Sequence, residues 1–432
     1  MLFSNIFFLI ISFLLAIYFY FFYKKGVSLL RIDFIFITFS YFIFFFPFFL
    51  NTNSNYLNVN INVLLNIYIF TFSYLLFFLL GFNSIKSLNL NLIKKNYMLL
   101  GKKYLFNFFF LISILYAIYF IYITINSNNI LYFFSPTLRR EYTIFSPSLF
   151  QLLLFSSFTS FILLIILKRI DKKKNFLITF LLLFLILFTN YGFFPKRVTS
   201  LSYLYIFIFW LIMFSNLKLS FKKYLILFNL TIFFIIFFLF LRIYLTNILF
   251  FKDSSIFEIF LIAFNTLHYS EIVNSFNVYF SDSNKIALSI KAFYGQNFFY
   301  REIIGTVFAF IPRFIWNDKP ENIVNLGYFF VVLENGFNDK KYSFALTQYL
   351  THYIYFGKFS LLVAFFYGLL VKLISNFIIR SYLSIFYPVF TILVVFYLYT
   401  GEITTLVYYN NSVFLSLLII SFYFLNKKKN AY

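Results

Sequence analysis

A series of long apolar runs constrains the fold of this chain more than any other feature. The runs fall near residues 2–23, 30–50, 61–82, 104–125, 148–167, 175–192, 199–216, 224–244, 358–376, 382–399 and 404–425. A helix of about twenty apolar residues is long enough to cross a hydrocarbon core of about 30 Å. Inside lipid each backbone N–H and C=O group has to be paired within its own segment, which a helix achieves. The sequence therefore predicts an all-α, polytopic integral membrane protein with about eleven transmembrane helices.

Basic residues are distributed unevenly between the two sides of these predicted spans. One side carries 21 of the 35 Lys and Arg residues and two of the 13 acidic residues, Asp33 and Asp171. Its basic residues are Lys24, Lys25, Arg31, Lys86, Lys94, Lys95, Lys102, Lys103, Lys168, Arg169, Lys172–Lys174, Lys218, Lys222, Lys223, Lys372, Arg380 and Lys427–Lys429. By the positive-inside rule this side is cytoplasmic, with the N-terminus outside and the C-terminus inside. Most of the net charge of +22 then lies in cytoplasmic loops beside anionic lipid. Nucleic-acid binding is disfavoured, since no basic stretch forms a separable soluble domain.

The longest segment expected outside the bilayer is an extracytoplasmic loop over residues 245–357. It lies between helices eight and nine of a single membrane domain, 1–432. A structureless loop of this length is unusual unless it has a function. Two of its stretches, EIIGTVFAFIPRFIW and IVNLGYFFVVL, contain apolar runs too short to cross a bilayer. We expect short interfacial or re-entrant helices there.

Missing residues exclude several kinds of chemistry. The chain has no cysteine, so it has no thiolate metal ligands, and its two histidines, His268 and His352, cannot form a histidine-rich metal cage. It has no GxxxxGK[ST] motif for nucleotide hydrolysis, and the centres of the predicted helices have almost no ionisable residues for proton-coupled transport. We expect no cofactor and no bound metal, although His268 and Glu271 have the i, i+3 spacing of a helical ligand pair. An enzyme acting at the outer face needs a substrate that is already activated, and a lipid-linked pyrophosphate sugar meets this requirement.

Arginine is the residue best suited to hold a pyrophosphate, because its planar guanidinium presents two parallel donors to phosphate oxygens. Arg197, in GFFPKRVTS, and Arg313, in IPRFIWNDKP, lie in proline-containing turns and are predicted as catalytic residues. His352 is predicted as a third catalytic residue, a general base at the outer surface just before helix nine. The residues expected to bind the substrate are Arg139, Arg140, Arg301, Trp316 and Lys319.

Each of these residues also has a structural interpretation. Arginines at helix ends commonly extend to lipid headgroups, and Arg242 fits this description best. Trp316 suits the aromatic belt at a membrane interface, and Lys319 can pair with Asp318 in its turn. His352 can be a structural histidine. Glu402, in the short outer turn TGEITT, is a further carboxylate for which either role is open.

Three stretches together resemble the O-antigen polymerases, the Wzy-type family that joins oligosaccharide repeat units. IPRFIWNDKP is similar to the family's Pro-Arg, Trp and Lys-Pro pattern late in its large outer loop. YLTHYIYFGKFSLLVAFFYGLL resembles a segment in which a Tyr and a Phe-Gly pair lead into the next helix. TNYGFFPKRVTSLSYLYIF resembles the arginine-containing turn that opens an earlier helix. The chain departs from the family at Thr351 and His352, which stand where members often carry an acidic residue.

The resemblance implies a bacterial inner-membrane glycosyltransferase of lipopolysaccharide or other surface polysaccharide biosynthesis. It would transfer the growing chain from undecaprenyl pyrophosphate onto the non-reducing end of a new lipid-linked repeat unit. Its expected partners are this lipid-linked oligosaccharide, the lipid bilayer, a chain-length regulator and a flippase. The alternatives are an O-antigen ligase, whose acceptor is a lipid A core, a polysaccharide flippase or transporter, and a non-catalytic membrane protein.

Overall fold

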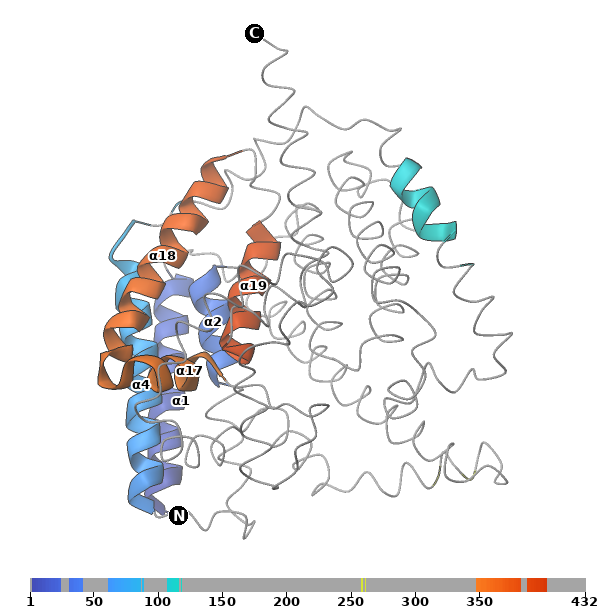
Figure 1. Ribbon diagram of the computed structural model, residues 1–432. Helices are drawn as coiled ribbons and strands as arrows, with labels where there is room; N and C mark the ends of the chain where they lie inside the picture. The colour runs from blue at the N-terminus through green and yellow to red at the C-terminus, as the bar shows by residue number, and fades with distance from the viewer. Residues whose placement is uncertain are drawn as a thin grey trace, which may run out of the picture. The chain divides into compact units, whose positions relative to one another are not determined.

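The computed structural model of the chain is shown in Figure 1. It describes residues 2–24, 31–41, 61–86, 88, 107–115, 118, 258, 261, 347–381 and 387–401. The labelled elements are α1 (Leu2–Lys24), α2 (Ile32–Ser40), α4 (Ile61–Asn83), α17 (Gln348–Phe356), the 3₁₀ turn η5 (Gly357–Phe359), α18 (Ser360–Arg380) and α19 (Tyr387–Thr400). Residues 107–115 are also helical, and the described part of the chain has no strand.

The prediction of an all-α fold is confirmed for these residues. The bounds of α1, α4 and α18 agree to within a few residues with the apolar runs 2–23, 61–82 and 358–376. α2 and α19 and the helical residues 107–115 overlap the runs 30–50, 382–399 and 104–125. The predicted spans between 148 and 244 and at 404–425 lie outside the described residues. So does the loop 245–346, apart from residues 258 and 261.

The contacts of the chain divide it into two compact units. One comprises Met1–Asn89, Val273–Phe377 and Phe390–Tyr409, and the other comprises Leu90–Ile272, Ile378–Val389 and Asn410–Tyr432. The first unit contains α1, α2, α4, α17 and most of α18 and α19. The two polar clusters described below both lie within this first unit.

The helices α4 and α18 approach each other closely, and this approach depends on two glycines. A Cβ atom on Gly81 of α4 would collide with the backbone carbonyl of Phe365 in α18. A Cβ atom on Gly368 of α18 would collide in the same way with the carbonyl of Phe78 in α4. Small residues at membrane helix interfaces allow this kind of backbone contact. The two glycines therefore set the distance between α4 and α18.

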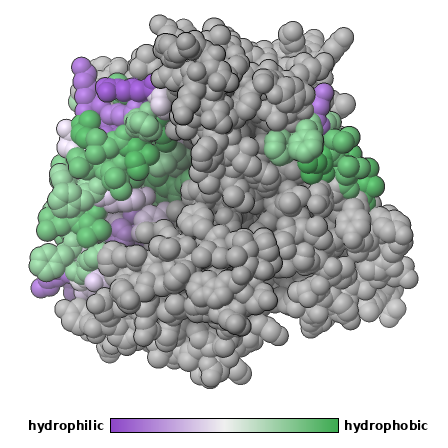
Figure 2. All heavy atoms as spheres, turned by 45° about the horizontal axis from the view of Figure 1, so that its top comes forward, coloured by the Kyte–Doolittle hydropathy of each residue, from purple (hydrophilic) through white to green (hydrophobic). Residues whose placement is uncertain are grey.

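The outward side of α18 carries a continuous apolar stripe. Its side chains are between 47% and 72% exposed and recur every three or four residues, at Phe359, Leu362, Phe366, Leu370, Leu373 and Phe377. The stripe covers about 27 Å of helix, close to the thickness of a hydrocarbon core. Figure 2 shows hydrophobic side chains gathered over the described helices, with hydrophilic residues at the upper and lower edges of this surface and a few within it. Among the described residues, one helical segment, Gln348–Arg380, is long and apolar enough to cross a membrane.

Helix α17 occupies the end of the stretch that the sequence assigned to the outer loop. It has nine residues and ends at Gly357, whose φ of 55° lies in the left-handed region that glycine adopts without a Cβ clash. The turn η5 then leads into α18. In Figure 1 α17 runs across the direction of α1 and α4, whereas α18 turns away from it. The Phe356–Gly357 pair thus marks a corner, and one face of α17 points into the helix group.

The close contact at the two glycines predicts that a glycine-to-alanine substitution destabilises the protein, the opposite of its usual effect in a helix. In an uncrowded helix Gly→Ala stabilises by up to about 1 kcal/mol, because alanine has the higher helix propensity. Gly368→Ala should instead lower the free energy of unfolding by about 1–3 kcal/mol, since the new methyl group forces the two backbones apart. The thermal unfolding midpoint of the purified protein in detergent measures the change.

A suitable control is Leu370→Ala, on the exposed stripe of α18, where Leu370 is 52% exposed. This variant should leave the midpoint nearly unchanged in detergent. A midpoint that rises in Gly368→Ala would contradict the close contact between α4 and α18.

Candidate functional site

His352 lies at the centre of a buried hydrogen-bonded group. Its Nδ1 atom lies 2.6 Å from the hydroxyl of Tyr74 in α4, and its Nε2 atom lies 3.0 Å from the hydroxyl of Tyr397 in α19. A neutral imidazole has one donor and one acceptor nitrogen, so one tyrosine donates to the ring and the other accepts from it. The group Tyr74–His352–Tyr397 is therefore a directional chain of hydrogen bonds across three helices.

Aromatic rings surround this chain of hydrogen bonds. The rings of Tyr74 and Tyr349 meet edge to face at 4.4 Å, and the hydroxyl of Tyr349 donates to Ser40 Oγ at 2.8 Å. Tyr367 of α18 contacts His352 and Tyr397 at ring distances of 6.3 and 5.6 Å. Because Tyr74, Tyr349 and Ser40 are at most 1% exposed, the group is held rigidly in an almost water-free interior.

The N-terminal end of α17 contains buried polar side chains that, unlike those around His352, do not complete their hydrogen bonds. Thr347 and Gln348 are completely buried, and neither the Thr347 hydroxyl nor either polar atom of the Gln348 amide completes a hydrogen bond within the described part of the chain. The Gln348 amide lies close enough to the hydroxyl of Tyr367 to interact with it, although the geometry falls short of a full hydrogen bond. Gln348 and His352 are four residues apart, so they share one face of α17.

The position of His352 differs from the one expected from the sequence. We expected a base at the outer surface, whereas the residue is 5% exposed and both of its ring nitrogens contact tyrosine hydroxyls. The reason is α17, which turns this segment inward before α18 begins. Both ring nitrogens are therefore occupied by tyrosine hydroxyls in the interior.

The other residues predicted for the site lie outside the described residues. They are Arg139, Arg140, Arg197, Arg301, Arg313, Trp316 and Lys319, as well as the alternatives His268, Glu271 and Glu402. Within the described ranges no group of three His, Asp or Glu side chains is placed to hold a metal ion.

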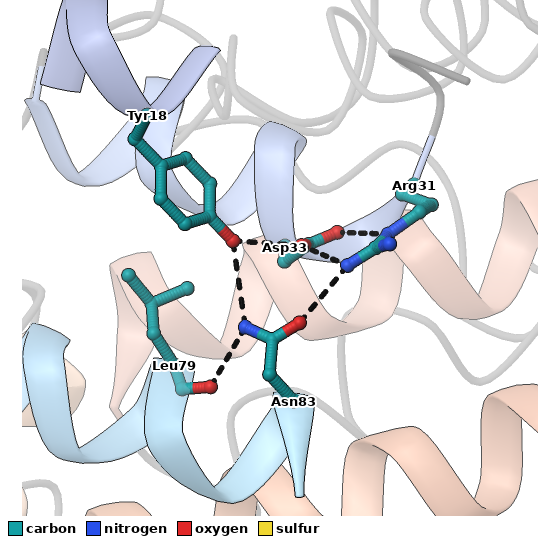
Figure 3. Close-up of polar contacts among 5 residues, drawn as sticks. All are labelled: Tyr18, Arg31, Asp33, Leu79 and Asn83. Atoms are coloured by element: carbon teal, nitrogen blue, oxygen red, sulfur yellow. Dashed lines mark hydrogen bonds and ion pairs between the residues drawn. The ribbon is translucent and has the colours of Figure 1, made fainter. Parts of the chain in front are cut away.

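A second polar cluster, shown in Figure 3, joins the ends of three helices. Arg31 donates to both oxygens of Asp33, from Nε at 2.9 Å and from a terminal nitrogen at 2.5 Å. It also donates to Asn83 Oδ1 at 3.1 Å, and Tyr18 donates to Asp33 at 3.1 Å. Asn83 in turn donates to the carbonyl of Leu79 at 2.9 Å. Asp33 is completely buried and Arg31 is 8% exposed, so this is an interior ion pair with its remaining groups bonded.

Lys372 of α18 is a further buried charged residue at this end of the helix group. It is 3% exposed, and its ammonium lies 4.2 Å from the ring centre of Phe82. The guanidinium of Arg31 lies 5.8 Å from the centre of the same ring, so both cations interact with the π-electrons of Phe82. Nearby, Asn376 of α18 donates to the carbonyl of Lys86 at 3.1 Å. Arg31, Lys86 and Lys372 were all assigned to one membrane side from the sequence, and here they gather at one end of the helices.

Sequence reasoning missed most of these contacts. Nothing in the sequence distinguishes Tyr74 and Tyr397 among 37 tyrosines, because their partner His352 is 278 residues away from Tyr74. The polar pair Gln348 and His352, spaced one helical turn apart, was a usable signal for an inward polar face. Asp33 was another, since it is one of two acids on the basic side of the predicted topology.

Comparison with known proteins does not extend this picture. No protein-family model, curated protein or solved structure matches the chain. The resemblance to O-antigen polymerases therefore remains a prediction from three short stretches.

The ion pair of Arg31 and Asp33 predicts a non-additive effect on stability. Asp33→Leu leaves a buried arginine without its carboxylate and should lower the free energy of unfolding by about 3–5 kcal/mol. The double variant Arg31→Met with Asp33→Leu should be less destabilised than Asp33→Leu alone, because neither charge is then buried. Thermal or denaturant unfolding of the wild type, Arg31→Met, Asp33→Leu and the double variant measures the difference.

Tyr18→Phe serves as the control, since it removes one hydrogen bond to Asp33 and keeps the ion pair. Its effect should be about 1 kcal/mol. Additive losses in the double variant would show that the two side chains do not interact.

Proposed function

We propose that the chain is a polysaccharide polymerase of the bacterial inner membrane. It joins undecaprenyl-pyrophosphate-linked oligosaccharide repeat units into O-antigen or another surface polysaccharide at the outer face of that membrane. The observation that carries the proposal is the corner at Phe356–Gly357. This pair lies in the longest of the stretches that resemble the family, and the corner brings His352 of the same stretch into a buried polar group.

The reaction requires three tasks of the protein. A hydroxyl of the acceptor sugar attacks the anomeric carbon of the donor, the bond to the pyrophosphate oxygen breaks, and the acceptor loses its proton. In this proposal Arg197 and Arg313 stabilise the negative charge that develops on the departing pyrophosphate. A donor aimed at such a charge contributes about 3–4 kcal/mol to the transition state. Arg139, Arg140, Arg301, Trp316 and Lys319 bind the rest of the substrate.

His352 is the proposed acceptor of the proton. Since both ring nitrogens contact tyrosine hydroxyls, the proton passes through one of them. The acceptor hydroxyl gives its proton to the tyrosine oxygen while the tyrosine gives its own proton to the imidazole. The tyrosine ends unchanged and the histidine becomes a cation. No nucleotide, cofactor or metal is needed, because the pyrophosphate already activates the donor.

The location follows from the same proposal. The substrate is anchored in the lipid bilayer, so the enzyme is a multi-pass protein whose site opens to the outer leaflet. The exposed stripe on α18 supports contact with lipid, because leaving six large apolar side chains in water is unfavourable. A flippase that delivers repeat units and a chain-length regulator are the proposed partners.

An O-antigen ligase is the nearest alternative and would use the same arginines with a lipid A core as the acceptor. A transporter is favoured by one observation, the buried charges Arg31, Asp33 and Lys372, since charges between helices can line a transport path. These charges are bonded at one end of the helix group, however, and do not continue along it. That arrangement fits a structural role better than a path.

Replacement of the two site arginines by lysine tests the proposal. Arg313→Lys and Arg197→Lys each keep the charge but lose the second parallel donor. Each should reduce polymer by about tenfold or more if the guanidinium holds the leaving group. The measurement is the length and amount of the polysaccharide ladder made by cells, with an immunoblot of the membrane fraction for protein abundance.

Arg242→Lys is the matched control, because either side chain can extend to lipid headgroups from the end of a helix. Its ladder should be normal. Normal ladders in both Arg313→Lys and Arg197→Lys would remove these arginines from the site and leave the proposal resting on resemblance alone.

A further inference from the structure

Unsatisfied polar atoms in the described residues are concentrated at the N-terminal ends of α17 and α18. Five buried side-chain atoms of the described residues have no hydrogen-bond partner, and four of them belong to Thr347, Gln348 and Ser360. The fifth is Asn376 Oδ1, at the other end of α18. Buried polar groups in folded proteins are nearly always bonded, so a concentration of exceptions calls for a physical explanation.

Gln348 is the most informative of these residues. Its amide offers two donors and one carbonyl acceptor, the residue is completely buried, and both of its polar atoms lack a partner among the described residues. A leucine or methionine side chain would fill the same space without the free-energy cost of burying unbonded polar atoms. A long amide in such a position suits a protein that binds a polar molecule there for part of its cycle.

The side chains around Gln348 indicate the chemistry of that molecule. The His352 imidazole lies one helical turn along the same face, and Tyr367 of α18 lies beside both residues. The Thr347 hydroxyl belongs to the residue just before Gln348, at the start of α17. All of these groups are neutral donors, neutral acceptors or aromatic surfaces. Arg31, Asp33 and Lys372 lie in the other cluster, and Lys358 at the corner is exposed. Neutral amides and hydroxyls among aromatic rings suit a hydroxyl-rich, uncharged ligand better than an anion.

We infer that the inner face of α17 is a sugar-binding site, in which Gln348 and Thr347 hold hydroxyl groups of the acceptor repeat unit next to His352. This inference rests on the proposed polymerase function for the identity of the sugar-bearing molecule. Gln348 donates to one hydroxyl and accepts from another, and Thr347 binds a third. The acceptor is thereby oriented with its reacting hydroxyl toward the Tyr74–His352–Tyr397 chain.

Access to this face depends on the corner at Gly357. α17 is joined to α18 through the three-residue turn η5. The residue that ends α17 and begins this turn is Gly357, which has a left-handed backbone conformation. A few backbone rotations at such a position are enough to move a short helix as one body. In the described arrangement the polar atoms of Gln348 and Thr347 are buried, so a sugar reaches them only when α17 moves in this way.

The test uses the purified full-length protein and two probes. One probe is the lipid-linked repeat unit extracted from the cells that carry this chain, and the other is undecaprenyl pyrophosphate without sugar. Gln348→Leu should weaken binding of the repeat unit about tenfold, the loss expected when a bonded polar group is removed from a ligand site. Its binding of undecaprenyl pyrophosphate should be unchanged. The thermal midpoint without ligand should be equal to or higher than that of the wild type, because an unsatisfied amide has been replaced by an apolar group.

Thr347→Val provides a second variant of similar shape and should weaken binding of the repeat unit several-fold. Thr351→Val is the matched control, since Thr351 is equally buried in α17 but its hydroxyl donates to the Thr347 carbonyl at 3.1 Å. It should not change binding of either probe.

Several outcomes would overturn the inference. These are normal binding of the repeat unit by Gln348→Leu, an equal loss for both probes, or no binding of the repeat unit by the wild type. The first outcome would mean that Gln348 contacts only buried water. If Gln348→Leu weakens binding but the wild type makes no polymer, the sugar site stands and the polymerase proposal fails. If the wild type makes polymer and Gln348→Leu binds normally, the polymerase proposal stands and the sugar site fails.

Discussion

The backbone contact between α4 and α18 at Gly81 and Gly368 is the constraint on which the described helix group depends. It fixes Phe78 against α18, where its ring meets Tyr367 at 5.7 Å, and the ring of Phe36 stacks on Phe78 at 3.9 Å. Because α4 is a continuous helix, this one contact also sets the positions of Tyr74 on one side and Asn83 on the other. Both polar clusters therefore take their geometry from an apolar contact between them.

The two clusters differ in how completely their polar groups are bonded, and the difference suggests different roles. Around Arg31 and Asp33 the charges face each other, and Asn83 and Tyr18 bond the remaining groups. Such a network holds helix ends in register and has little capacity left for a ligand. Around α17 the chain Tyr74–His352–Tyr397 is complete, while Gln348 and Thr347 next to it are not. Local violations of bonding rules are expected where a protein binds or transforms a substrate.

Hydropathy was sufficient to predict the long helices, because a run of about twenty apolar residues has few alternatives in lipid. α1, α4 and α18 were therefore predictable to within a few residues. α17 was not, since nine mixed residues before a glycine carry no comparable signal. The site was harder still to predict from the sequence. Tyr74 and His352 lie on different helices, and they become hydrogen-bond partners only through the packing of those helices. Of the predicted site residues, the structure describes His352 alone, and it lies in the interior rather than at the expected surface position. The predicted arginines lie outside the described residues.

The central claim is that this chain alone polymerises lipid-linked repeat units without a nucleotide or a metal. The most direct measurement is reconstitution of the purified protein in vesicles with its lipid-linked repeat unit, in the presence of a chelator, followed by separation of the products by size. The account predicts a ladder of polymer on undecaprenyl pyrophosphate and release of free undecaprenyl pyrophosphate. Products that form only when a lipid A core is supplied would identify a ligase. Movement of the repeat unit across the bilayer with no polymer, or strict dependence on an added divalent ion, would contradict the account.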